Sequence, residues 1–129
     1  MYFTFSQKMS LSITIVTLDP DTKRICDSDP YPENGEDLVG FESWRSEVYA
    51  SSAFKSRGAT YLPTLDSHEL VVDSEHLELF RSEVETLLSD IENLGKELNL
   101  DPSQLGHRLR NMLSATLTAI REGKAVWIC

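Results

Sequence analysis

The sequence predicts an α+β fold, in which a small, mainly antiparallel sheet carries an antiparallel helical hairpin and one further helix on one face. Three patterns lead to this class. Residues 11–18 alternate apolar and polar side chains, residues 73–122 repeat apolar side chains every three or four positions, and residues 124–129 form a short apolar run. Alternation is typical of a half-buried strand, and the longer spacing is typical of an amphipathic helix. The expected element order is β-β-α-β-(β)-α-α-β, with the helices forming a layer on the sheet.

Length and composition indicate a single domain spanning residues 1–129. The chain has 129 residues, of which 40% are hydrophobic and 26% charged, and these are ordinary values for a globular domain. A chain of this size buries roughly two thirds of the surface that it exposes when unfolded, which is enough for a core without staples. Residues 1–8 precede the first patterned segment and are interpreted as a flexible N-terminal extension.

The first predicted elements are a β-hairpin and a loop. Every second residue of the first strand is apolar, so one of its faces is expected to be buried: Leu11, Ile13 and Ile15. The sequence DPDT at residues 19–22 is typical of a turn, because proline presets the second position and aspartate bonds the backbone. Residues 23–27 then form the return strand. Residues 28–40 contain two prolines and two glycines, which indicate a loop.

One helix is predicted over residues 43–58. Phe41, Trp44 and Val48 recur at helical spacing, which favours the aromatic residues as core residues of a helix and predicts that Trp44 is mostly buried. Ser43 is a suitable N-cap, and Gly58 supplies the left-handed position that ends many helices. A strand over residues 38–43 is the competing interpretation of the start of this stretch.

A short edge strand is predicted next, over residues 59–65. Pro63 has no amide hydrogen for a ladder, so a central strand is excluded. Residues 70–72 either pair back with this strand as a hairpin or lead into the next helix.

Residues 73–98 carry the strongest helical pattern in the chain. Asp73 or Ser74 is the expected N-cap, and Asn99 suits the position just beyond the end. The apolar positions recur at threes and fours for about six turns: Leu77, Phe80, Val84, Leu87, Leu88, Ile91, Leu94 and Leu98.

The last helix follows so closely that the two helices are expected to run antiparallel. Asp101 is its predicted N-cap, Pro102 its first residue and Gly123 its end. Its expected buried face is Leu105, Leu109, Met112, Leu113, Thr116, Leu117 and Ile120. Its expected polar face is His107, Asn111, Ser114 and Thr118, with Arg108, Arg110 and Arg121 alongside. Residues 124–129 then form a strand that joins the first strand in the sheet.

Charge and cysteine usage limit the classes of partner and compartment. The net charge of −9 disfavours nucleic acid and anionic membranes, which are polyanions, and favours a basic protein surface as partner. Cys26 and Cys129 have no zinc-ligand spacing and are expected to be free thiols in a reducing compartment. The sequence predicts no signal peptide, no spanning helix and no cofactor motif, so a cytoplasmic protein is expected.

An acidic segment is the main candidate for binding a partner. Eight acids and only two bases lie between residues 19 and 42, a local charge of −6. Within it, residues 27–42 are the predicted contact loop, with aromatic side chains as anchors and carboxylates as steering groups. The predicted contact residues are Asp27, Asp29, Tyr31, Glu33, Glu36, Asp37, Glu42 and Trp44. A solvated loop that keeps the protein soluble is the alternative.

A calcium loop is excluded within this segment. Asp27 and Asp29 have the spacing of the first two ligands of an EF-hand, but Tyr31, Pro32 and Leu38 occupy positions that require a ligand, a glycine and a glutamate. We therefore predict no metal site here.

Three hypotheses of function follow. The first is a non-enzymatic binding protein that masks a basic partner, because the composition and layout resemble those of small acidic inhibitor or immunity proteins of bacteria. The second is a small enzyme that uses His68, or His107 with Arg110, in a polar cleft. The third is a structural subunit of a homodimer joined through the helical hairpin. A concave polar site would favour the enzyme, and a flat or convex acidic face would favour the masking protein.

Overall fold

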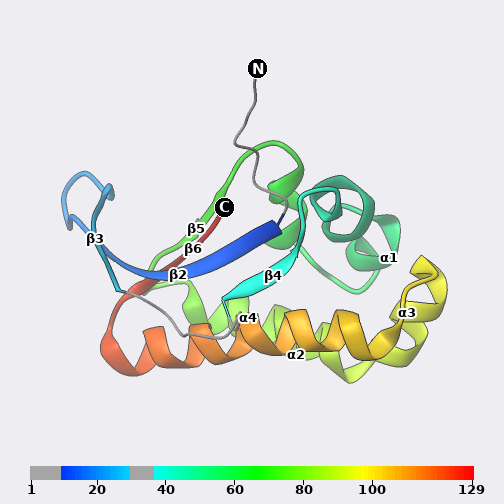
Figure 1. Ribbon diagram of the computed structural model, residues 1–129. Helices are drawn as coiled ribbons and strands as arrows, with labels where there is room; N and C mark the ends of the chain where they lie inside the picture. Colours follow the sequence, from blue (N-terminus) through cyan, green and yellow to red (C-terminus); the bar gives the residue numbers. More distant parts are fainter. Residues whose placement is uncertain (1–9, 30–36) are drawn as a thin grey trace, which may run out of the picture.

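A computed structural model describes residues 10–29 and 37–129 of the chain (Figure 1). In these residues, five antiparallel strands form one sheet in the order β3-β2-β6-β5, with β4 also paired to β2. The strands are β2 (Ser10–Leu18), β3 (Ile25–Asp29), β4 (Leu38–Phe41), β5 (Leu70–Val72) and β6 (Ala125–Ile128). The predicted α+β class and antiparallel sheet are confirmed.

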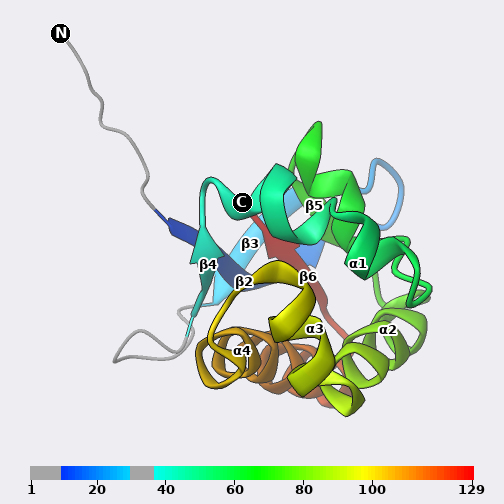
Figure 2. The same ribbon diagram turned by 90° about the vertical axis from the view of Figure 1, so that its right-hand side faces the viewer.

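The helical elements pack mainly below and beside this sheet (Figure 2). Three α-helices form the lower layer, and α2 and α4 run in opposite directions, as the hairpin prediction required (Figure 1). In chain order the helical elements are η1 (Arg45–Tyr49), α1 (Ser52–Lys55), η2 (Leu62–Asp66), α2 (Leu77–Ser89), α3 (Ile91–Leu98) and α4 (Pro102–Glu122).

Strand β2 organises the sheet. It pairs with β6 along one edge, while β3 and β4 follow one another along its other edge. The predicted alternation is confirmed, since Leu11, Ile13 and Ile15 are at most 1% exposed and face the core. The predicted last strand is confirmed as well, because β6 pairs with β2 from Ile13 opposite Ile128 to Val16 opposite Ala125.

The predicted loop over residues 28–40 ends earlier than expected. Residues 38–41 form strand β4, so the competing strand interpretation is correct there. Gly40 has φ of +137°, a conformation that side chains rarely allow. A Cβ atom at this position would also lie 2.7 Å from Cε3 of Trp44. Glycine at position 40 therefore lets the indole pack directly against the backbone of β4.

The predicted helix over residues 43–58 is two short helices. A π-helical turn, η1, is followed by α1, and the chain between them is extended at Ser51. The Ser51 hydroxyl accepts a hydrogen bond from the Phe54 amide, so Ser51, not Ser43, is the side-chain cap. Serine readily bonds nearby backbone groups, and this competition with the helix explains the break. Gly58, with φ of +89°, ends the segment as predicted.

The predicted strand over residues 59–65 is wrong, since a 3₁₀-helix, η2, lies at Leu62–Asp66. The carboxylate of Glu83 on α2 accepts hydrogen bonds from the backbone amides of Thr60, Tyr61 and Leu62 at 2.7–3.0 Å. A distant side chain therefore satisfies the donors that a strand would have offered to a neighbour. Strand β5 pairs with β6 and not with this segment.

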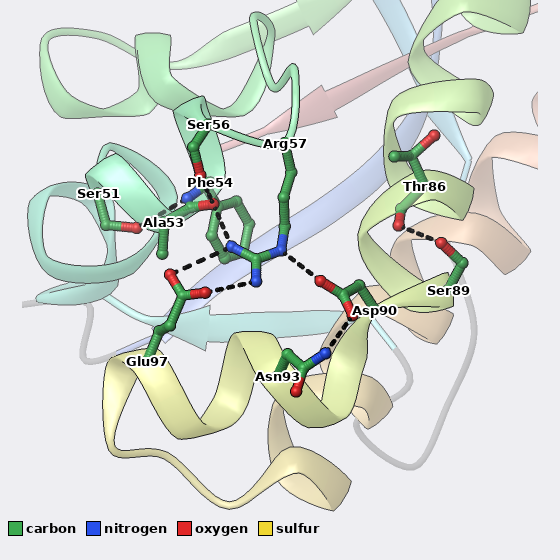
Figure 3. A network of polar contacts seen from close by, with 10 residues as sticks. All are labelled: Ser51, Ala53, Phe54, Ser56, Arg57, Thr86, Ser89, Asp90, Asn93 and Glu97. Atoms are coloured by element: carbon green, nitrogen blue, oxygen red, sulfur yellow. Dashed lines mark hydrogen bonds and ion pairs between the residues drawn. The ribbon is translucent and has the colours of Figure 1, made fainter.

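The long helix predicted over residues 73–98 is broken at Asp90 into α2 and α3. It begins later than predicted, at Leu77, and neither Asp73 nor Ser74 is its N-cap. Arg57 explains the break, because its guanidinium lies 2.9 Å from an oxygen of Asp90 and 2.6 Å from one of Glu97 (Figure 3). The bend lets both carboxylates reach one arginine side chain that is only 13% exposed.

Replacement of Arg57 with methionine is expected to make the free energy of unfolding depend less on pH in the acid range. Hydrogen bonds from Asn93 and Arg57 lower the pKa of Asp90, and a hydrogen bond from Arg57 lowers the pKa of Glu97. Because these folded-state pKa values are lowered, the stabilisation is present above the unfolded values near ~4 and is lost as the pH falls through the folded values. Urea unfolding at a series of pH values should show a steeper acid loss for wild type than for Arg57→Met.

Arg81→Met is the matched control for this experiment. Arg81 forms exposed pairs along α2 with Glu78 and Glu85 at 3.3 Å, so its removal should change the pH dependence of stability less. Equal acid slopes in wild type and Arg57→Met would contradict the role of Arg57.

Helix α4 begins and ends as predicted. The Asp101 carboxylate accepts a hydrogen bond from the Ser103 amide at 2.9 Å, and Pro102 is the first helical residue. Asn99 and Gly123 both adopt the left-handed conformation expected at helix ends.

The predicted buried face of α4 is confirmed in part, since Leu105, Leu109, Met112 and Thr116 are fully buried. Leu113, Leu117 and Ile120 are only partly buried, whereas Ala115 and Ala119 are fully buried. Small alanine side chains allow the helix to lie close to its neighbours, and the buried stripe is rotated toward them. Asn111, predicted on the polar face, is 7% exposed and donates a hydrogen bond to the Leu38 carbonyl of β4 at 2.8 Å. Leu88, another predicted buried position, is also only partly buried.

Candidate interaction surface at the acidic segment and Phe41

Strand β3 presents the first acids of the predicted contact loop. Asp27 is exposed, and Asp29 is half-buried. The Asp29 carboxylate forms an ion pair with Nζ of Lys124 at 2.5 Å, so its charge is partly neutralised within the chain. The predicted contact residues Tyr31, Glu33 and Glu36 lie outside the described residues.

The remaining acids lie at either end of β4. Asp37 is half-buried, and its backbone carbonyl accepts a hydrogen bond from the Ile13 amide at 2.8 Å. Glu42 accepts a hydrogen bond from Nε of Arg45 at 2.8 Å, and Arg45 also donates to the Leu65 carbonyl at 3.1 Å. Glu42 therefore positions an arginine that joins η1 to η2 and is less available to a partner than the sequence indicated.

Trp44 lies in the core and not on the surface. Its side chain is 6% exposed, which confirms the predicted burial of this residue, so any contact that Trp44 makes with a partner is indirect. Phe41 takes the exposed position instead, at 48%, with its ring packed edge-to-face on Trp44 at a centroid distance of 5.7 Å. The same geometry continues inward from Trp44 to Tyr49 at 6.0 Å and from Tyr49 to Phe54 at 5.5 Å.

This aromatic stack is fixed by a buried hydroxyl. The Tyr49 hydroxyl donates a hydrogen bond to the Val39 carbonyl of β4, and burial raises the pKa of Tyr49 well above its ordinary value. The phenol therefore remains neutral and holds η1 against β4 at every pH in ordinary use. Edge-to-face pairs add about 0.5–1.5 kcal/mol each beyond area burial, so the stack supports Phe41 as a rigid surface ring.

A cavity of about 230 Å³ adjoins Phe41. The first turns of α4 contribute its other lining residues: Ser103, Gln104, His107 and Arg108. Arg110, which one hypothesis paired with His107, lies over Gly106, where a Cβ atom would be 3.0 Å from its Nη1, and it is not among the residues that line this cavity. The arginine that accompanies His107 in the cavity is Arg108.

His68 and the two cysteines were also singled out from the sequence, and the His68 carbonyl oxygen lies 3.5 Å from Nη1 of Arg45, the ion-pair partner of Glu42. His68 is exposed, and its Nδ1 lies 2.7 Å from the Glu69 carbonyl oxygen. Cys26 and Cys129 are not joined by a disulfide, and the Cys26 thiol contacts the Thr17 carbonyl at 3.4 Å.

One cluster at the start of α2 has the donor atoms of a cation site. Possible ligand atoms of Asp73, Glu75 and His76 lie within 4.8 Å of one another. Asp73 already accepts a hydrogen bond from the Glu75 amide at 3.1 Å and contacts Nδ1 of His76 at 2.7 Å. These contacts organise the chain before α2, and they account for the cluster without a metal ion.

Phe41 is the residue that sequence reasoning missed. Phe41 lies three positions before Trp44, and in a helix this spacing would place both side chains on one buried face. In the structure Phe41 is the last residue of strand β4, and its side chain is exposed. The sequence signal for this arrangement is Gly40, directly before Phe41. Glycine lets the Trp44 ring pack on the backbone there, and the Phe41 side chain is left exposed.

Comparisons with known proteins find no match for this chain among protein-family models, curated proteins or solved structures. In the described part of the chain, no helix has both the length and the apolar composition required to cross a bilayer.

Proposed function

We propose that this protein is a non-enzymatic binding protein that masks a basic protein partner through residues 27–42, with Phe41 as the central apolar contact. The observation that carries the proposal is the exposure of Phe41, 48%, at the end of the acidic segment and on top of a buried aromatic stack. Aromatic side chains that are rigid before binding lose little conformational entropy on association, and they are common energetic centres of interfaces.

Charge supports a basic partner. The net charge is −9, and the acids of residues 19–42 contribute a large share of it. Asp27 is exposed on β3, whereas Asp29 and Glu42 form ion pairs with Lys124 and Arg45. In this proposal the unpaired carboxylates raise the association rate, and Phe41 slows dissociation.

Salt-dependent capture from an extract of the source organism tests this proposal. The immobilised protein is expected to retain a basic protein at low salt and to release it as the salt concentration rises, because screening shortens the Debye length to ~3 Å at 1 M. A triple variant in which Glu33, Glu36 and Asp37 become the corresponding amides should retain much less of it.

The matched control removes three charges elsewhere. Changing the exposed residues Glu69, Glu75 and Glu92 to glutamine alters the net charge equally but leaves residues 27–42 intact. Retention should then stay close to that of wild type. Equal losses in both triple variants would show that total charge alone determines capture and would refute the proposed site.

A further inference from the structure

The cavity beside Phe41 combines a cation with an apolar wall. It lies between the end of β4 and the first turns of α4, has a volume of about 230 Å³, and is lined by Phe41, Ser103, Gln104, His107 and Arg108. None of these residues carries a negative charge. Cavities for drug-sized ligands have volumes of ~300–1,000 Å³, so the occupant of this one is smaller.

Arg108 differs from the arginines that stabilise the fold. Arg45, Arg57 and Arg81 each form an ion pair with a carboxylate at 2.6–3.3 Å. The half-buried Arg108 side chain forms no ion pair or hydrogen bond with any residue in the described ranges 10–29 and 37–129. The side chains of Gln104 and His107 likewise have no such bond within these ranges. A partly desolvated guanidinium whose donors are unused within these ranges favours a carboxylate, which can accept two parallel hydrogen bonds.

We propose that this cavity binds a small organic carboxylate with an apolar body. The guanidinium of Arg108 receives the two carboxylate oxygens, and the ring of Phe41 covers the apolar body. Gln104 and His107 offer further hydrogen-bonding groups beside them. Phe41 belongs both to this cavity and to the proposed contact surface for a basic partner, but the two ligands differ in charge, because the cavity ligand is an anion.

Titrations followed by NMR amide shifts test the site with defined probes. Benzoate is expected to cause saturable shifts centred on Phe41, Gln104 and Arg108. Benzamide has the same shape without the charge, and inorganic phosphate has charge without the apolar body; each should bind at least about tenfold more weakly. N-acetylphenylalanine, which mimics the end of a peptide, distinguishes the two sources of such a carboxylate: tighter binding than benzoate assigns the site to a chain end, and weaker binding assigns it to a free acid.

Two variants of neighbouring arginines complete the test. Arg108→Gln is expected to weaken benzoate binding at least about tenfold, whereas Arg110→Gln, which removes the same charge from the same helix, should leave it unchanged. Melting temperatures of both variants establish that they are folded. The proposal is overturned if benzoate shifts do not saturate, if Arg110→Gln weakens binding as much as Arg108→Gln, or if phosphate or benzamide binds as tightly as benzoate.

Discussion

Deletion of residues 124–129 is expected to unfold the protein. These residues contain β6, which lies between β2 and β5 and is the only described strand that pairs with β5. Val126 and Ile128 are fully buried, and complete burial of such side chains contributes about 1.5–3 kcal/mol each. Together with the lost ladders, this is a large part of a typical total stability of ~5–15 kcal/mol. Circular dichroism and thermal melting of the truncated protein measure the effect.

Two milder variants separate the contribution of the buried side chains of β6 from that of the charge on Lys124. Ile128→Ala should keep the fold and cost about 2–5 kcal/mol, as expected for a large-to-small change in a core. Lys124→Ala removes the partly exposed ion pair with Asp29 and should cost far less. A truncated protein that melts at the wild-type temperature would show that β6 is not a central part of the sheet.

Replacement of Trp44 with alanine is expected to lower the free energy of unfolding by about 3–5 kcal/mol, the usual cost of deleting a buried aromatic side chain. The indole fills the space beside Gly40 and contacts both Phe41 and Tyr49, so its removal leaves a cavity beneath β4. Urea unfolding measures the loss.

The same experiment on Phe41→Ala provides the comparison. Phe41 is half-exposed and lies at the outer end of this row of edge-to-face contacts, so its removal should cost much less than the removal of Trp44. If the two variants lost equal stability, Phe41 would be a core residue and not a surface contact.

Elements with strong local signals were predictable from the sequence. The alternation in β2, the cap formed by Asp101 and Pro102, and the left-handed residues Asn99 and Gly123 all act within a few positions of the chain. These signals depend on the local backbone, so they do not require knowledge of the tertiary structure.

Two of the errors arose where a distant residue determines the local structure. Glu83 satisfies the amides of residues 60–62, so this segment does not need a neighbouring strand. Arg57 forms ion pairs with Asp90 and Glu97, and the helix predicted over residues 73–98 is broken at Asp90, beside this arginine. Neither partner can be found from periodicity, because the contacts join residues 21 to 40 positions apart.

The candidate surface was predicted only in part. The concentration of acids between residues 19 and 42 is visible in the sequence, but the ion pairs that occupy Asp29 and Glu42 are not. Trp44 and Phe41 are both large aromatic residues within one helical turn of each other in the sequence. Which of them is buried depends on the packing of the indole on Gly40, a tertiary contact.

The most direct test of the proposed surface is the dissociation rate of the captured basic protein from variants of exposed apolar residues. Phe41→Ala is expected to raise this rate at least about tenfold, because a central aromatic contact commonly contributes more than 1.4 kcal/mol. Leu79→Ala is the control, since Leu79 is 61% exposed on α2, outside residues 27–42, and its removal should leave the rate unchanged. An unchanged rate for Phe41→Ala, or an equal rise for both variants, would contradict the account.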